Sequence, residues 1–201
     1  MTKFYAVHKG LTVQNKIFTS WKECEDEVRG VKNAKYKSFT TEKQAKDWLE
    51  YLNGFKTQES KNILVAYTDG SFFKDNPKII GYGAVLVIND EVIHKISDGI
   101  ECNDSKYNNV AGEIYAAVNA TKFAIENGYK EILIKPDYQG VISWADGSWQ
   151  TKNSLTKMYK EIMDLYSKSI KIYFEKVDGH KGIKYNEIAD QLAKEGILNY
   201  K

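Results

Sequence analysis

The chain has 201 residues, of which 42% are hydrophobic and 28% charged, as is ordinary for a soluble globular protein. This length suits one or two domains and allows a proper buried core. No apolar stretch approaches the ~18 residues of a membrane-spanning helix, and the first residues lack the apolar core of a signal peptide. The cysteines, Cys24 and Cys102, lie far apart without metal-ligand spacing, so we expect free thiols. These features predict a cytoplasmic protein without a membrane partner, and since nothing indicates an obligate dimer, we expect a monomer.

The net charge of +2 is unevenly distributed along the chain. Residues 1–60 contain 11 basic and 8 acidic residues, whereas residues 61–201 contain 18 basic and 19 acidic residues. A small basic module joined to a larger, nearly neutral one suggests that the first part tethers the protein to a polyanion.

The first 52 residues predict a compact α/β unit. Strands are expected where apolar residues alternate, at residues 4–7, 16–19 and 35–39. Helices are expected at residues 21–28 and 41–52, each opened by a capping box, Ser20–Glu23 and Thr41–Gln44. Residues 53–61 are polar, contain glycine and have no pattern, so they are predicted to be a linker.

Residues 62–201 predict a larger unit of five strands and four helices. Strands are expected at short apolar or alternating runs, residues 63–67, 83–88, 91–96, 131–135 and 170–174. Helices are expected at residues 111–127, 139–145, 155–167 and 185–197. This order predicts a mixed sheet with three antiparallel strands in succession and two reached through helices. Right-handed crossovers place the strand at 131–135 beside the strand at 63–67 and parallel to it.

An acidic residue, Asp69, follows the apolar strand at 63–67 directly. A carboxylate there is costly to bury unless it is paired or binds a cation. The alternative interpretation is that Asp69 caps a turn with Gly70 and Ser71, which is common for an Asp-Gly pair.

Three further carboxylates could converge on Asp69. Asp137 follows the strand at 131–135, so it should lie near Asp69 at the carboxyl ends of neighbouring parallel strands, where open α/β sheets bind their ligands. Glu113 begins a helix and Asp190 lies on the last helix. Each has a plain alternative: a favourable charge at a helix N-terminus for Glu113, a helix cap for Asp137 and solvation for Asp190. Together, however, clustered carboxylates suit Mg²⁺ or Mn²⁺.

Five short motifs follow one another in the larger unit: Tyr67–Ser71 with Gly81–Val85, Val110–Glu113, Asp137–Gly140, Gly179–His180 and Asn186–Asp190. Their order and spacing resemble those of type 1 ribonuclease H, over about residues 62–201. Three motifs in the first unit resemble the hybrid-binding domain that precedes many of these enzymes: Phe4–Val7, Thr19–Cys24 and Lys35–Phe39.

The resemblance implies a fold and an activity. The fold is a mixed five-stranded α/β sheet flanked by helices and preceded by a small α/β domain. The implied domains are a hybrid-binding domain at 1–52, a linker at 53–61 and a catalytic domain at 62–201. The implied activity is a Mg²⁺-dependent endonuclease that hydrolyses the RNA strand of RNA–DNA hybrids, leaving 5′-phosphate and 3′-hydroxyl ends.

The resemblance also implies catalytic residues. Asp69, Glu113, Asp137 and Asp190 would hold two Mg²⁺ ions, for which Mn²⁺ is a substitute. One ion would activate a water and the other would stabilise the leaving 3′ oxygen. His180 would assist proton transfer or product release, although a histidine beside glycine is more often a plain loop residue.

Further residues are implied to contact the hybrid: Gly70, Ser71, Asn108, Asn109 and Asn186 in the larger unit and Tyr5, Trp21, Tyr36 and Lys37 in the smaller. Because A-form geometry hides base edges, RNA must be recognised through its 2′-hydroxyls, a role that suits the asparagine pair. The aromatic residues could equally be core residues.

Some family members insert a basic helix at the place of residues 141–153, whereas here Lys152 is the one basic residue of that stretch. We therefore expect the first domain to supply most of the affinity for the hybrid. The sequence does not decide whether Trp144 and Trp149 are core or substrate-facing.

Two alternatives remain open at this level. The chain could be a hybrid-binding protein with an inactive nuclease domain, although the intact acidic motifs argue against it. It could also be a related nuclease that acts on another nucleic acid, which the hybrid-binding motifs and the His180 segment disfavour.

Overall fold

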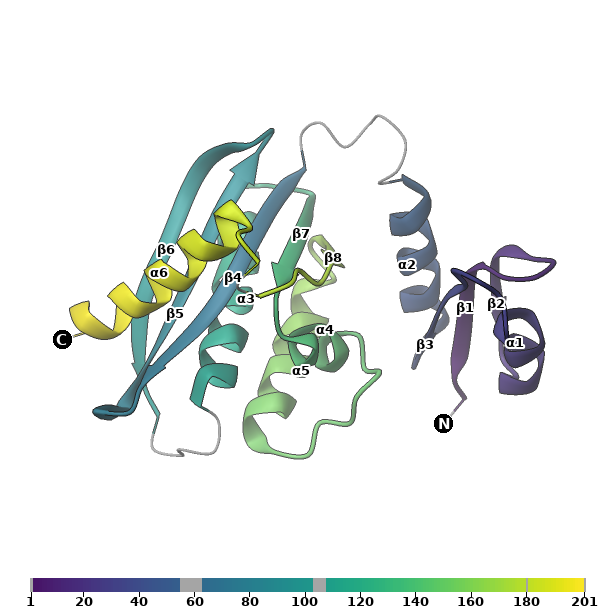
Figure 1. Ribbon diagram of the computed structural model, residues 1–201, viewed down its shortest axis with the longest axis horizontal. Coiled ribbons are helices and arrows are strands. Elements are labelled where there is room, and N and C mark those ends of the chain that lie inside the picture. The colour runs from purple at the N-terminus through teal and green to yellow at the C-terminus, as the bar shows by residue number, and fades with distance from the viewer. Residues whose placement is uncertain (1, 55–62, 103–107, 180, 201) are drawn as a thin grey trace. The chain divides into compact units, whose positions relative to one another are not determined.

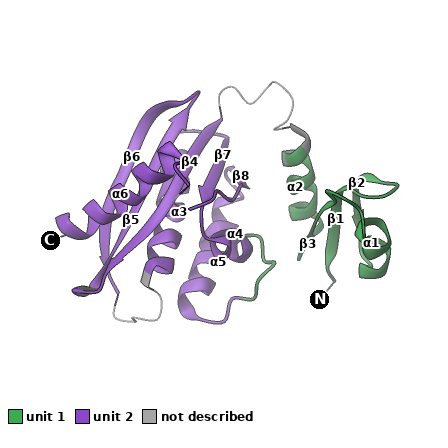
Figure 2. Ribbon diagram, viewed as in Figure 1, with its two compact units in different colours: residues 1–60, 146–150 green, residues 61–145, 151–201 purple. Residues whose placement is uncertain are grey.

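A computed structural model describes residues 2–54, 63–102, 108–179 and 181–200. The chain forms two compact units: residues 1–60 with 146–150, and residues 61–145 with 151–201 (Figure 2). Most of the predicted linker, residues 55–61, lies outside the described residues. The predicted domain boundaries therefore stay a prediction. Among the described helices, none is both long and apolar enough to cross a bilayer.

The first unit contains a three-stranded antiparallel sheet with strand order β2-β1-β3. Its elements are β1 (Phe4–Lys9), β2 (Gln14–Phe18), α1 (Trp21–Val28), β3 (Lys35–Phe39) and α2 (Glu42–Gly54). Alternating residues of β1 face two small core clusters. The cluster that includes α1 residues consists of Val7, Phe18, Cys24 and Val28. The cluster that includes α2 residues consists of Ala6, Phe39, Ala45 and Leu49. The sheet is therefore covered by one helix on each face.

The two predicted capping boxes have different outcomes. Ser20 is the N-cap of α1, but its side chain makes no capping hydrogen bond, so that prediction is wrong. At α2, the backbone N–H of Gln44 donates to Thr41 Oγ1 at 3.3 Å, as predicted. The Gln44 side chain, however, accepts a hydrogen bond from Thr40 instead of completing the box (3.1 Å).

The second unit is a mixed five-stranded sheet with strand order β6-β5-β4-β7-β8 (Figure 1). Its strands are β4 (Leu64–Phe73), β5 (Asn76–Ile88), β6 (Glu91–Glu101), β7 (Glu131–Pro136) and β8 (Lys171–Phe174). Its helices are α3 (Asn108–Glu126), α4 (Gln139–Ala145), α5 (Ser154–Tyr166) and α6 (Lys184–Asn199). The β4–β5–β6 strands are antiparallel, and β7 is parallel to β4, as the crossover argument predicted.

Helices cover both faces of this sheet. On one face, Leu64 and Ala66 of β4 join the larger core cluster with residues of α3 and α5. On the other face, Val65 and Tyr67 pack with Ala189 and neighbouring residues of α6. Figure 1 shows α6 crossing β4 and β5 on the side opposite α3. Alternate residues of β4 therefore belong to different layers, as expected for a central strand.

Strand β4 is longer than the sequence predicts, because it continues through the Asp-Gly-Ser stretch to Phe73. The interpretation of Asp69 to Ser71 as a turn is therefore wrong. Gly70 is required here by close packing: a Cβ atom at this position would lie 2.3 Å from the carbonyl oxygen of Asn109 and 2.4 Å from the Glu113 nitrogen. Strand β4 thus runs beneath the first turns of α3 without a side chain between them.

Candidate active site

The end of β7 brings Asp69 and Asp137 together. Parallel pairing of β4 with β7 extends to Thr68 opposite Pro136. Asp69 is the next residue of β4, and Asp137 is the first residue after β7. The two therefore lie where β7 ends and β4 continues. Asp69 is buried, with 6% of its surface exposed, and its Oδ1 accepts a hydrogen bond from the Gly70 N–H at 2.7 Å.

The third carboxylate, Glu113, is delivered by α3. The backbone contact at Gly70 holds the Glu113 turn against β4. Glu113 is 4% exposed. Its Oε2 is buried and has no hydrogen-bond partner among the described residues.

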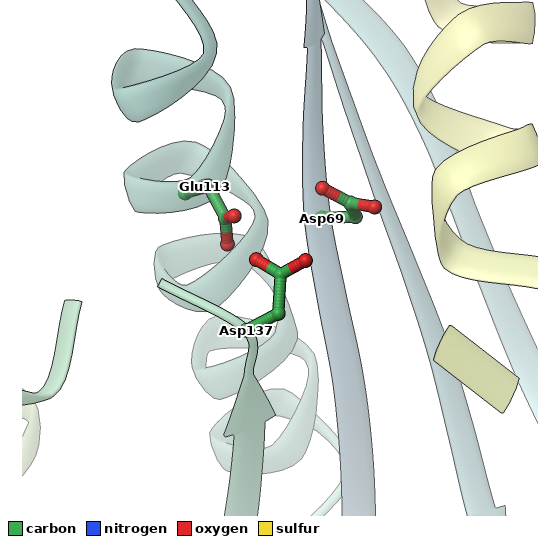
Figure 3. A group of neighbouring side chains, drawn as sticks. All are labelled: Asp69, Glu113 and Asp137. Carbon is green, nitrogen blue, oxygen red and sulfur yellow. The ribbon is translucent and has the colours of Figure 1, made fainter. Parts of the chain in front are cut away.

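Asp69, Glu113 and Asp137 form one group: one carboxylate oxygen from each lies within 4.8 Å of the others. Figure 3 shows the three side chains, from β4, α3 and the end of β7, converging with the Asp137 carboxylate between the other two. Burial raises the pKa of Glu113 well above its usual range, and a hydrogen bond with Asp137 and the negative charges of Asp69 and Asp137 raise it further.

This arrangement fits a divalent cation. Oxygen ligands alone suit Mg²⁺ or Mn²⁺, and the unpartnered Oε2 of Glu113 offers a lone pair that no described residue uses. A bound cation would offset the mutual repulsion of the carboxylates and replace the proton that burial favours on Glu113.

The fourth predicted ligand, Asp190, is not in the group. Its Oδ2 accepts a hydrogen bond from Lys194 Nζ at 2.6 Å, one turn further along α6. Helix α6 nevertheless passes close to Asp69. Gly83 of β5 pairs with Asp69, and a Cβ atom added at Gly83 would lie 2.3 Å from the carbonyl oxygen of Ala189 on α6. The structure therefore brings three of the four acids together, and the role of Asp190 as a ligand stays a prediction.

The segment after β8 also reaches the site. Gly179 lies against the Asp137 carboxylate. The predicted His180 follows it but lies outside the described residues. In the sequence, Gly179 belongs to the Gly179–His180 motif, but nothing in that motif indicates its contact with Asp137.

The predicted substrate residues of this unit differ in exposure. Gly70 and Ser71 are buried, whereas Asn109 at the start of α3 is exposed. The side chain of Asn108 lies outside the described residues. Asn186 on α6 is 3% exposed, and its Oδ1 has no hydrogen-bond partner in the described part of the chain. Their contacts with substrate stay predictions.

In the first unit, three aromatic side chains form a row. The ring centroids of Tyr5 and Trp21 are 5.5 Å apart, and those of Trp21 and Tyr36 are 6.1 Å apart. Trp21 is 43% and Tyr36 46% exposed, so the alternative interpretation of these two as core residues is wrong. Tyr5 is half-buried, as is Lys37 on β3.

The two tryptophans that the sequence left undecided also differ. Trp144 is half-buried and packs against Tyr138, with ring centroids 5.8 Å apart. Trp149 is 43% exposed. Trp144 thus contributes to packing around α4, whereas much of Trp149 is open to solvent.

Comparison with known proteins agrees with this picture. Residues 60–198 match the family described as RNase H, and residues 3–49 match the Ribonuclease H1 N-terminal domain. The chain is 31% identical to the ribonuclease H of Thiobacillus denitrificans over 68% of this chain and 95% of that protein. It is 23% identical to the ribonuclease H1 of Rattus norvegicus over 96% of this chain and 88% of that protein.

The fold has solved counterparts as well. The structure of RNase H1 from Halobacterium salinarum superimposes with a TM-score of 0.58 at 25% identity, covering 67% of this chain and 97% of that one. The predicted fold class and family are therefore confirmed. The chain belongs to the ribonuclease H family and carries an N-terminal domain of the ribonuclease H1 type.

Proposed function

We propose that this protein is a divalent-metal-dependent endonuclease that hydrolyses the RNA strand of RNA–DNA hybrids, leaving 5′-phosphate and 3′-hydroxyl ends. The observation that carries the proposal is the group of three carboxylates at the end of β7, of which Asp69 and Glu113 are buried and Asp137 is half-buried. A protein of the same fold, LC11-RNase H1, has been solved in complex with an RNA/DNA hybrid (TM-score 0.57, 20% identity). That complex supports the hybrid as the substrate class.

Asp69, Glu113 and Asp137, joined by Asp190, would hold two Mg²⁺ ions, with Mn²⁺ as a substitute. When bound, such ions supply an activated water and stabilise the leaving 3′ oxygen. The chain's own contribution is to hold the carboxylates together and to release a proton from Glu113, whose pKa is raised, when cations bind. His180 would assist proton transfer or product release.

Substrate binding is divided between the units in this proposal. Asn108 and Asn109 would read the 2′-hydroxyls at the start of α3, and Asn186 would lie near the reacting phosphate. The exposed aromatic row of the first unit would pack against the sugars of the DNA strand, with Lys37 at a phosphate. The basic balance of residues 1–60 supports a role of this unit in binding a polyanion.

Cleavage of three labelled substrates tests the proposal: an RNA–DNA hybrid, a double-stranded RNA and a duplex DNA, each with and without Mg²⁺. We expect cleavage of the hybrid alone, and only with Mg²⁺. Asp69→Asn should abolish cleavage while the protein stays folded, because it removes a charged ligand from the group. Asp164→Asn, at an exposed position of α5, is the matched control and should cleave normally.

The other outcomes identify the competing functions. Hybrid binding without cleavage would mean an inactive binding protein, and cleavage of another substrate would mean a related nuclease. Wild-type turnover by Asp69→Asn would show that the metal assignment is wrong.

A further inference from the structure

The chain after β8 remains bound to the edge of β7. The regular pairing of these strands ends at Ile134 opposite Phe174. Beyond it, the Glu175 N–H donates to the Ile134 carbonyl and the Val177 N–H donates to the Pro136 carbonyl, each at 3.0 Å. These bonds continue the ladder to the last residue before Asp137. The backbone of β7 up to Pro136 and that of the following segment up to Val177, two residues before Gly179, are therefore held together.

At the end of this ladder, Gly179 occupies space that has no room for a side chain. A Cβ atom at Gly179 would lie 2.5 Å from Oδ2 of Asp137 and 3.3 Å from its Cγ. A methyl group cannot approach a carboxylate oxygen that closely in a well-packed structure. The atoms that this methyl group would meet all belong to the Asp137 side chain, so that side chain is the part that would rotate away.

Rotation of Asp137 would disturb the acidic group. Its carboxylate lies between those of Glu113 and Asp69 (Figure 3), and its interaction with Glu113 helps to raise the pKa of that residue. A change in its direction would separate oxygen atoms that now lie within 4.8 Å of one another. The cation site needs these oxygens together, since ligand geometry is a main determinant of divalent-ion affinity.

We propose that Gly179 is a positioning residue for Asp137: because it has no side chain, it leaves the Asp137 carboxylate free to adopt the orientation that completes the cation site. This inference deepens the proposed function and rests on its metal site. It assigns a reason for glycine at a position directly before the predicted catalytic histidine.

A neighbouring glycine provides a matched control. Gly182 lies three residues further along the same segment and has a φ of +73°, and a methyl group added there would meet no described atom within 4 Å. Glycine is favoured there by backbone conformation, not by lack of space. Alanine at 182 therefore strains the segment without touching Asp137.

The experiment measures Mn²⁺ binding to the full chain by titration calorimetry, together with the thermal midpoint of the metal-free protein. The variants are Gly179→Ala, Gly182→Ala, Asp137→Ala and the double variant Asp137→Ala with Gly179→Ala. We expect Gly179→Ala to weaken Mn²⁺ binding by about tenfold or more, as when the support of a metal ligand is lost. Gly182→Ala should bind Mn²⁺ like the wild type.

The double variant tests whether Gly179 acts through Asp137. With the carboxylate gone, Gly179→Ala should weaken Mn²⁺ binding no further and should cost no additional thermal stability. Three results would each overturn the inference. They are wild-type Mn²⁺ affinity in Gly179→Ala, an equal loss of Mn²⁺ affinity in Gly182→Ala, and an undiminished effect of Gly179→Ala in the Asp137→Ala background. Failure of the wild type to bind Mn²⁺ would overturn the proposed metal site. The thermal midpoints of the metal-free variants would then test, separately, whether a side chain at residue 179 collides with Asp137.

Discussion

At the scale of single residues, Glu113 is an acidic side chain held in an environment very different from water. It is 4% exposed, and burial together with its acidic neighbours raises its pKa well above the usual range. The folded protein therefore holds a proton on Glu113 over a pH range in which the unfolded chain has lost it. This proton contributes to the free energy of unfolding. The contribution is fully present below about pH 4.5, the pKa of Glu113 in the unfolded chain, and is lost as the pH rises through the higher pKa of Glu113 in the folded protein.

Glu113→Gln should remove this loss, because glutamine does not ionise. Without metal at pH 8, we expect the variant to melt above the wild type, because the wild type must either keep a proton on Glu113 or bury its charge. At pH 4 the two should melt together. Thermal unfolding in chelator across this pH range measures the difference.

The control for this prediction is Glu126→Gln, at the surface end of the same helix, where the side chain is 61% exposed. It should follow the wild-type pH dependence. Parallel pH curves for Glu113→Gln and the wild type would mean that folding does not raise the pKa of Glu113.

At the scale of elements, helix caps show where local sequence and structure agree. Asn153 is the N-cap of α5, and its Oδ1 accepts a hydrogen bond from the Thr156 N–H at 2.8 Å. Ser20 holds the same position at α1 without such a bond. Residues of the same class at the same position therefore stabilise their helices unequally.

Asn153→Ala should lower the free energy of opening of α5 by about 1 kcal/mol, since it leaves an N-terminal N–H without its partner. Ser20→Ala should leave α1 nearly unchanged, because no side-chain bond is lost. Amide hydrogen exchange of each helix measures both effects. A comparable loss at both helices would show that the side-chain bond does not determine cap strength here.

Much of the element order could be predicted because apolar periodicity is a local property. The helices expected at 21–28 and 139–145 match α1 and α4 to the residue. The meeting of Asp69 with Asp137 could be predicted from the handedness of crossovers alone. The extension of β4 through Gly70 could not, because the Asp-Gly-Ser sequence favours a turn and only contact with α3 explains a glycine there.

The same limit applies to the candidate site. Sequence spacing placed Asp190 on the last helix but did not reveal its hydrogen bond with Lys194. The contact between Gly179 and Asp137 depends on hydrogen bonds that extend past the end of β8, which no periodic pattern encodes. Residues that act through backbone packing are thus the hardest to find from sequence.

At the scale of the whole molecule, the exposed aromatic row of the first unit is the feature that assigns it a separate task. Trp21→Ala should raise KM for an RNA–DNA hybrid by about tenfold, in line with the loss of one aromatic nucleic-acid contact. The kcat should stay unchanged, because the contact binds ground state and transition state alike.

Leu11→Ala is the control, since Leu11 is a 68% exposed apolar residue of the same unit outside the aromatic row. Its KM should equal that of the wild type. Steady-state kinetics at one fixed, moderate salt concentration make the comparison, because affinity for nucleic acid depends on salt. A lower kcat with unchanged KM in Trp21→Ala would argue against a binding role.

The burial of Cys24 has a practical consequence for following the opening of the first unit. Its thiol is fully buried in the first unit, and burial raises its pKa, so it is inert while that unit is closed. An alkylating reagent can reach it only during transient opening. The modification rate of this one sulfur therefore reports how often its surroundings in the first unit open.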